Sequence, residues 1–333
     1  MLPPTYLDRR QIADLLPMHE CISVMERMFL ALARGECLQP LRSLLWLPDH
    51  SGLLGMMPGY SAAGSSGPDG QPASAREAGI LGIKVLTIFH GNGAKGLPSH
   101  QGVVMLFDAN TGTPLLLLDA AEITAIRTAA ASAVATRLLA RREASHLAIL
   151  GTGEQAEKHI EAISLVQNVS RITLWGRNRS HAEDLALRLE ARYNIPFHIA
   201  DSAQQAAANA HILCTVTASP TPVLEGAWIP AGAHINAVGS CTPSTRELDT
   251  AAVVRSRLFT DRYESLFREA GEFLIPRSEG LLTESDVRGE IGEVLTGLKP
   301  GRLDANEITV FKSLGIAMED LFAARHIYDK FIA

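Results

Sequence analysis

Residues 146–156 read HLAILGTGEQA, and this stretch decides the fold. A short apolar run meets Gly151-Thr152-Gly153, and a helix-compatible sequence opens at Glu154. Such a turn brings backbone N–H groups and a helix N-terminus up to a pyrophosphate. Residues 171–176 (RITLWG) predict a second strand after a helix-length spacer, which completes a βαβ unit. A tight glycine turn in an ordinary α/β domain is the alternative. The stretch favours a dinucleotide site formed by Gly151, Thr152, Gly153, Glu154, Gln155 and Ala156.

The end of the second strand indicates which dinucleotide binds. An NAD site usually offers an acid there to the ribose 2′-hydroxyl. This chain instead has Arg177-Asn178-Arg179, with no acid before Glu183. An arginine fork matches a 2′-phosphate in charge and geometry, so NADP(H) is favoured while NAD(H) stays possible. The alternative is that both arginines are simply solvated.

Composition limits the class of protein. The 333 residues are 47% hydrophobic and 20% charged, which is enough for two domains with real cores. A net charge of −6 and the lack of a basic stripe argue against nucleic acid as a partner. The four widely spaced cysteines suggest reduced thiols in a cytoplasm. No run of about 18 apolar residues occurs and the first ten residues lack an apolar signal core, so we expect no membrane span.

The first part of the chain predicts an antiparallel sheet with one helix. Residues 18–34 have apolar side chains at helical spacing and end near Gly35. A tight turn at 110–112 predicts a hairpin between the last two strands. Residues 62–79, rich in Gly, Ser, Pro and Ala, predict a mobile surface loop. The strand candidates are 41–47, 53–57, 80–89, 103–107 and 114–118.

The rest of the chain predicts a doubly wound sheet. An alanine-rich helix over 122–141 leads into the dinucleotide strand, and further strands are expected at 197–200, 212–217, 234–239 and 258–261. Residues 309–332 are amphipathic, carry no sign of another strand of that sheet, and are expected to return to the first domain. We therefore predict an α/β protein with a Rossmann-type domain over 123–305 and an α+β domain formed by 1–122 with 306–333.

Six segments together resemble the ornithine cyclodeaminase/μ-crystallin family. They are MPGYS (57–61), PSHQG (98–102), EITAIRTAAASAVAT (122–136), GTGEQA (151–156), HINAVG (234–239) and TVFKSLGIAMED (309–320). The resemblance spans nearly the whole chain. It implies NAD(P) chemistry that interconverts an amino acid or cyclic amine with an imine, a substrate and dimerisation domain completed by the C-terminal helix, and a homodimer.

The resemblance assigns three cations to the substrate carboxylate, namely Arg42, Lys84 and Arg127. An arginine fork can bind the planar carboxylate of an α-imino acid in a bidentate manner. Lys84 is also a candidate proton donor to the imine nitrogen, since burial lowers the pKa of an ammonium group. His100 is a second candidate donor, although a histidine at a strand start is more often structural. Without the resemblance, each cation would be read as an ordinary surface charge.

Further positions are expected along the cofactor. Strand ends of an open α/β sheet line the crevice that binds ligands. The resemblance adds residues of the PSHQG, AIRTAA and FKSLG segments. The predicted contacts are Ser99, Thr128, Thr215, Val216, Thr217, Val238, Gly239, Lys312, Ser313 and Leu314.

Two departures from the family pattern disfavour a cyclodeaminase. The resemblance places a Glu just before the Met-Pro and an Asp after HINAVG in cyclodeaminases, but this chain has Gly55 and Cys241 there. Without those carboxylates, amine deprotonation and ring closure lack an evident catalyst. The histidine and cysteine spacings predict no metal site.

We therefore expect an NADP(H)-preferring reductase of small imino acids. Cyclodeamination, an alanine dehydrogenase-type reaction and a non-enzymatic NADP-dependent binding protein of the crystallin type remain alternatives.

Overall fold

The computed structural model describes residues 4–62 and 79–333, so most of the expected loop over 62–79 lies outside the described residues. The chain divides into two compact units. One comprises Met1–Arg127 with Ile316–Ala333, and the other is Thr128–Gly315. An all-parallel sheet in the second unit and a mainly antiparallel sheet in the first confirm the α/β fold class.

The first unit is built on a seven-stranded sheet within the described residues. Neighbouring strands pair antiparallel except β1 with β7, which is parallel and was not expected. The expected hairpin is confirmed as β6–β7. The strand order is β1 (Thr5–Leu7), β7 (Pro114–Asp119), β6 (His100–Asp108), β5 (Ile80–Ile88), β4 (Leu53–Ser61) and β2 (Cys37–Leu38), with β3 (Ser43–Trp46) also paired to β4.

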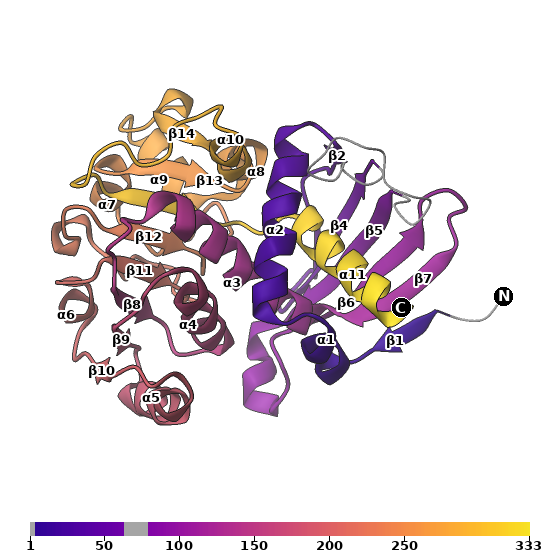
Figure 1. Ribbon diagram of the computed structural model, residues 1–333, viewed down its shortest axis with the longest axis horizontal. Helices are drawn as coiled ribbons and strands as arrows, with labels where there is room; N and C mark the ends of the chain where they lie inside the picture. Colours follow the sequence, from indigo (N-terminus) through magenta and orange to yellow (C-terminus); the bar gives the residue numbers. More distant parts are fainter. Residues whose placement is uncertain (1–3, 63–78) are drawn as a thin grey trace. The chain divides into compact units, whose positions relative to one another are not determined.

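Helices cover one face of this sheet (Figure 1). The C-terminal helix α11 (Ala317–Phe331) packs on β4, β5 and β6, while α2 (Met18–Ala33) and α1 (Arg9–Leu15) pack against α11. A side chain at Gly82 would place its Cβ 2.5 Å from Leu321 Cδ2 and 2.6 Å from the Met105 carbonyl oxygen. Glycine on β5 therefore permits the close approach of α11 to the sheet.

The second unit contains an eight-stranded parallel sheet in the described part of the chain. The first βαβ unit comprises β8, α4 and β9, as the sequence predicted. Strand order reverses between β8 and β11, which is where open α/β sheets bind ligands. The order is β10 (Phe197–Ile199), β9 (Arg171–Trp175), β8 (His146–Leu150), β11 (Ile212–Thr215), β12 (His234–Ala237), β15 (Thr309–Lys312), β13 (Arg257–Thr260) and β14 (Val287–Glu290).

The helices of the second unit follow the expected alternation with strands. Helix α3 (Ala120–Leu139) begins in the first unit and continues into the second. The others are α4 (Glu154–Val166), α5 (Arg179–Tyr193), α6 (Ala203–Ala207), α7 (Thr250–Val254), α8 (Tyr263–Glu269), α9 (Gly271–Ser278) and α10 (Ile291–Leu295), with short 3₁₀ turns at His90–Lys95, Gly226–Trp228 and Glu284–Asp286.

The C-terminal stretch requires a correction. Its first residues form β15, which lies between β12 and β13, so the expectation that residues 309–332 add no strand to this sheet is wrong. The returning segment starts at Ile316 rather than at 306. The sequence did not reveal β15 because its four residues are buried on both faces and show no apolar–polar alternation. The strand also ends in Lys312, which weakens the apolar signal.

Candidate active site

A buried charge cluster in the first unit contains two of the three predicted cations. Lys84 lies on β5 opposite Met57 and Val104 and is 4% exposed. Its Nζ donates to Asp320 Oδ1 at 3.0 Å and to Thr124 Oγ1 at 2.5 Å. Burial lowers the pKa of Lys84 to about 8, against the opposing effect of the Asp320 carboxylate. An ammonium group with this pKa can exchange a proton near neutrality.

Arg127 lies in the same cluster. Its Nε donates to Asp320 Oδ1 at 3.1 Å, and its Nη1 donates to Glu319 Oε2. Both carboxylates are fully buried and lie in the first turn of α11, where the helix dipole favours negative charge. Two buried cations thus face two buried carboxylates, so their formal charges cancel.

The other first-unit residues predicted for the site are placed differently. Arg42 is half-buried just before β3, and its charge contributes to lowering the pKa of Lys84. His100 is exposed, and its Nδ1 lies 2.9 Å from Ser99 Oγ. His100 and Val104 are four positions apart on β6, a distance of about 13 Å along the strand. The strand register therefore does not bring His100 to Lys84.

The glycine turn of the second unit has the geometry that a dinucleotide requires. Gly151 has a φ of 130°, and a Cβ there would lie 2.7 Å from the Val216 carbonyl oxygen. Gly153 is the N-cap of α4, makes no side-chain cap, and has open space where a Cβ would stand. Exposed N–H groups at a helix start bind anions. Thr152, Glu154 and Gln155 lie at this start, and buried Ala156 lies in its first turn.

The loop after β9 carries the predicted ribose residues. Arg177 is exposed, and Asn178 caps α5 by accepting from the Ser180 N–H. Arg179 differs because its guanidinium contacts the carboxylates of Glu183 and Asp201. Arg177 is therefore better placed than Arg179 to meet an added phosphate.

The strand ends hold the remaining predicted cofactor residues. Thr128 is buried in α3, and Thr215 is the last residue of β11. Residues 216–217 follow β11, and residues 238–239 follow β12. Lys312 is fully buried, where its Nζ donates to the Ser240 carbonyl at 2.5 Å and lies 3.2 Å from Glu272 Oε2. Lys312 therefore acts inside the protein rather than as an exposed cation. Ser313 and Leu314 are buried beside it.

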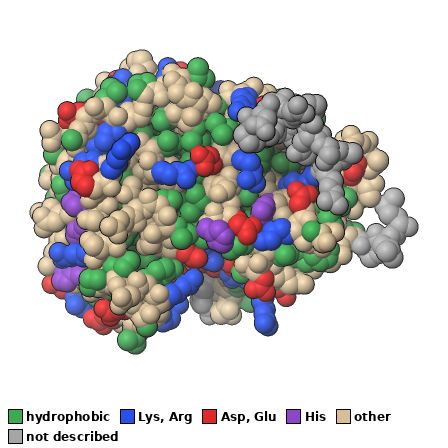
Figure 2. Space-filling view, in the orientation of Figure 1, with side chains coloured by type: hydrophobic (Ala, Val, Ile, Leu, Met, Phe, Trp, Pro, Cys, Tyr) green, Lys and Arg blue, Asp and Glu red, His purple; other side chains and the backbone are tan. Residues whose placement is uncertain are grey.

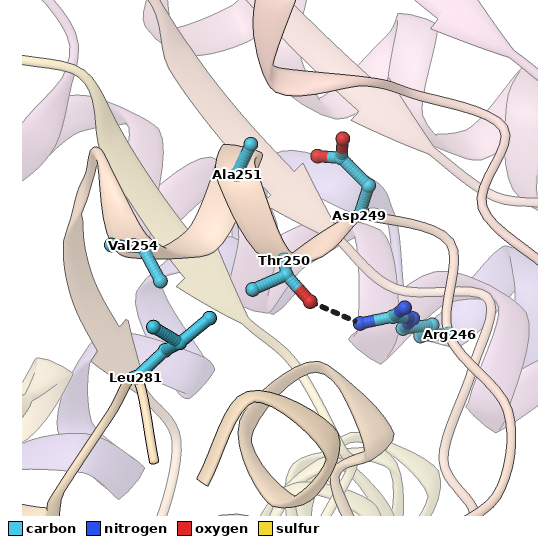
Figure 3. Close-up of a pocket in the computed structure, with 6 residues that line it drawn as sticks. All are labelled: Arg246, Asp249, Thr250, Ala251, Val254 and Leu281. Carbon is cyan, nitrogen blue, oxygen red and sulfur yellow. Dashed lines mark hydrogen bonds between the residues drawn. The ribbon is translucent and has the colours of Figure 1, made fainter. Parts of the chain in front are cut away.

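A surface cavity of the second unit involves other residues (Figure 3). It has a volume of about 460 Å³, and Arg246 donates to Thr250 at its edge. Its wall consists of Arg246, Asp249, Thr250, Ala251, Val254 and Leu281. None of these was predicted to bind substrate or cofactor. Among the described residues, no group of three or more His, Cys, Asp and Glu is arranged to hold a metal ion.

Comparison with known proteins decides the family. The model of the ornithine cyclodeaminase/mu-crystallin family matches residues 4–333. The chain belongs to this family. The resemblance recognised in the sequence is thereby confirmed.

Three known proteins illustrate the similarity. Ketimine reductase mu-crystallin of Mus musculus is 38% identical over 295 residues, which cover 89% of this chain and 86% of that protein. The structure of Thermococcus litoralis Delta(1)-pyrroline-2-carboxylate reductase with NADH and L-proline has a TM-score of 0.91 at 35% identity and covers 98% of this chain and 97% of its own. An archaeal alanine dehydrogenase dimer with bound NAD has a TM-score of 0.89 at 29% identity and covers 99% and 96%.

The two departures from the cyclodeaminase pattern of this family are clear in the structure. Gly55 is two residues from Met57 on β4, so a side chain at 55 would share the sheet face of Lys84. Its Cβ would contact Leu44 and Leu86 at 3.5 Å. Cys241 is a half-buried thiol in the loop after β12. Neither position offers a carboxylate.

Sequence reasoning missed the buried acids of this family member. Glu319 and Asp320 pair with the two buried cations, Lys84 and Arg127, and Glu247 binds the loops after β11 and β12. A signal was present, because GIAMED places two adjacent acids directly after an apolar run. Acids in such a position are rarely buried unless they are paired. They therefore indicate buried cationic partners.

Proposed function

We propose that this chain is an NADPH-preferring reductase of small imino acids that yields L-amino acids. The carrying observation is the buried Lys84–Asp320 pair beside Arg127, in a chain that also has the glycine turn of a dinucleotide site. The enzyme is an NAD(P)-dependent oxidoreductase acting on a carbon–nitrogen bond, in keeping with the named activities of its relatives. When bound, NAD(P)H supplies the hydride that the imine carbon accepts.

The cofactor would lie on the second unit's own residues. Gly151 admits the backbone close to the pyrophosphate, and the N–H groups at the start of α4 bind its oxygens. Arg177 favours a 2′-phosphate, since residues 177–182 contain no acid to accept from a 2′-hydroxyl. The Thermococcus litoralis reductase contains NADH and the archaeal alanine dehydrogenase contains NAD, so NAD(H) remains the alternative cofactor.

The substrate would be held and protonated by residues of the first unit. Arg42 and Arg127 supply guanidinium groups for the carboxylate, and Lys84 supplies an ammonium group. Two of the three Lys84 N–H groups donate to Asp320 and Thr124. The third would donate its proton to the imine nitrogen, which becomes the amine of the product. Burial keeps the pKa of Lys84 near 8, so the amine can be reprotonated from water between turnovers.

A homodimer would bury the second face of the first unit's sheet. Pro58, Ile83, Met105 and Leu117 lie directly opposite one another across four strands, and each is half-exposed. On β3 the exposed side chain of Leu45 lies opposite Leu54 and so shares this face. Contiguous apolar surface of this kind marks an interface. Light scattering on the wild type should give twice the chain mass, and Ile83→Glu should shift it toward the monomer; a monomeric wild type contradicts the proposal.

Charges of both signs occur on the face of the molecule that Figure 2 shows. Lys and Arg side chains are interspersed with Asp and Glu on the face shown in Figure 2. No helix among the described residues is long and apolar enough to cross a membrane.

The test measures NADPH oxidation by absorbance in the presence of each of several imines. Purified protein is offered pyrroline-2-carboxylate, piperideine-2-carboxylate, iminosuccinate formed from oxaloacetate with ammonia, and pyruvate with ammonia. We expect rapid oxidation with at least one imino acid and loss of it in Lys84→Met. Proline formed from ornithine with NAD⁺, without any imine reduction, would instead identify a cyclodeaminase. Binding of NADPH with no turnover would support the crystallin-type alternative.

A further inference from the structure

One buried carboxylate ties together the two loops at the ligand edge of the second unit's sheet. Glu247 Oε1 accepts from the Thr217 N–H at 2.6 Å and from its Oγ1 at 2.7 Å. Its Oε2 accepts from the Gly239 N–H at 2.6 Å. Thr217 follows β11, and Gly239 follows β12. Three hydrogen bonds to one buried carboxyl group thus join the two loops.

A second buried pair supports Glu247 from behind. Glu272 Oε1 accepts from the backbone N–H of Glu247 at 2.9 Å, and Glu272 Oε2 lies 3.2 Å from Lys312 Nζ. Lys312 ends β15 and donates to the carbonyl of Ser240, the residue after Gly239. Both members of the pair are fully buried. The network therefore links the ends of three adjacent strands, β11, β12 and β15.

The loops that Glu247 joins are packed without spare room. A Cβ at Gly239 would lie 2.0 Å from the Thr217 carbonyl oxygen and 2.6 Å from Glu247 Oε1. The contact therefore depends on a glycine at 239 and on a carboxylate at 247 that accepts hydrogen bonds from both loops. An amide at 247 would present N–H groups where the loops already donate, which leaves buried donors facing each other.

We propose that Glu247 is a positioning residue for the cofactor, acting by fixing the backbones of Thr217 and Gly239 at the strand ends. The inference rests on the proposed NADPH function. Strand ends beside the reversal of strand order are where ligands of such sheets bind, and β11 is at this reversal. When the loops already have the geometry of the bound state, cofactor binding does not have to order them, and the affinity is higher.

The test compares Glu247→Gln with a matched variant two residues further on. Asp249 Oδ1 also accepts from two backbone N–H groups, those of Ala252 and Gly226, but it caps α7 (Figure 3) and its hydrogen bonds are not to Thr217 or Gly239. Both substitutions should lower the melting temperature. Titration of NADPH fluorescence should show a roughly 10- to 100-fold higher Kd in Glu247→Gln only, since a lost charged hydrogen bond has that effect. Asp249→Asn should bind NADPH as the wild type does.

A milder pair keeps the inference testable if Glu247→Gln does not fold. Thr217→Val removes the hydroxyl that donates to Glu247, while Thr217→Ser retains it. We expect weaker NADPH binding in the valine variant and rescue in the serine variant, with the KM for the imine unchanged in both. Equal NADPH affinity in Glu247→Gln and wild type, or equal loss in Asp249→Asn, would overturn the inference. A wild type that binds no NADPH would instead refute the proposed function itself.

Discussion

Replacing Asp320 by Asn should shift the pH profile of the reduction. The Asp320 carboxylate lies 3.0 Å from Lys84 Nζ, and both groups are buried. In the wild type we expect kcat/KM to fall as pH rises through the pKa of Lys84 at about 8, because the neutral amine has no proton to donate. Asp320 raises that pKa by its charge and its hydrogen bond, so its neutralisation must move the falling limb to lower pH.

The size of the shift follows from the geometry. Unit charges 3.0 Å apart interact by about 5 kcal/mol at an effective dielectric constant of about 20, which sets an upper limit of about four pH units. Observed effects of one opposing charge are about one to three pH units, so the limb should lie at about 5 to 7. At pH 8 the variant should lose about fivefold or more of the wild-type kcat/KM and recover on acidification.

The assay is the pH dependence of kcat/KM for the imine at saturating NADPH. Asp329→Asn serves as the matched control, because it makes the same substitution on the same helix in an exposed pair with Arg325. Breaking a buried pair should also lower the free energy of unfolding of Asp320→Asn by about 3 to 5 kcal/mol, which urea denaturation measures. A profile that superimposes on the wild type, or a falling limb that persists in Lys84→Met, would refute the role of Lys84 as proton donor.

Three further outcomes are expected. Arg177→Ala should raise the KM for NADPH about tenfold and leave that for NADH unchanged, as measured by initial rates with each cofactor, because only the 2′-phosphate needs the guanidinium. Arg42→Ala should raise the KM for the imine strongly with little change in NADPH affinity; equal loss of both would contradict its assignment to the carboxylate. Burial lowers the pKa of His159 to about 4, so between pH 6.5 and 4 the unfolded chain binds a proton that the folded chain does not. The free energy of unfolding, measured by urea denaturation, should therefore decrease as the pH is lowered from 6.5 to 4. The decrease should be smaller in His159→Gln.

Local sequence signals predicted the elements that carry their own pattern. The βαβ unit from β8 to β9 was readable because a glycine turn, a helix of regular length and two apolar runs stand in sequence. The antiparallel strands were readable because one face of each is buried, which imposes alternation. By contrast, β14 (VRGE) and β15 (TVFK) contain few apolar residues and each ends in a charged one, which gives a weak apolar signal.

The candidate site likewise has parts that the sequence could predict and parts that it could not. The glycine turn and the arginine loop are contiguous segments, so the sequence alone could propose them. The partners of Lys84 lie 40 and 236 residues away along the chain, and those contacts exist only after α3 and α11 pack against the sheet. The family resemblance identified the cations, but it did not identify the buried carboxylates that pair with Lys84 and Arg127. Tertiary packing decides whether a lysine is a solvated charge or a proton donor.

Charge balance in the cluster has a consequence for how substrate binds. Lys84 and Arg127 already face Glu319 and Asp320, so an incoming carboxylate meets cations whose charge is largely neutralised inside the protein. Removing either cation alone would leave two buried carboxylates facing one cation, and the resulting loss of stability would add to any effect on binding. Arg42, which is half-buried and lies outside that set of four, is therefore the residue at which substrate affinity can be measured separately from folding.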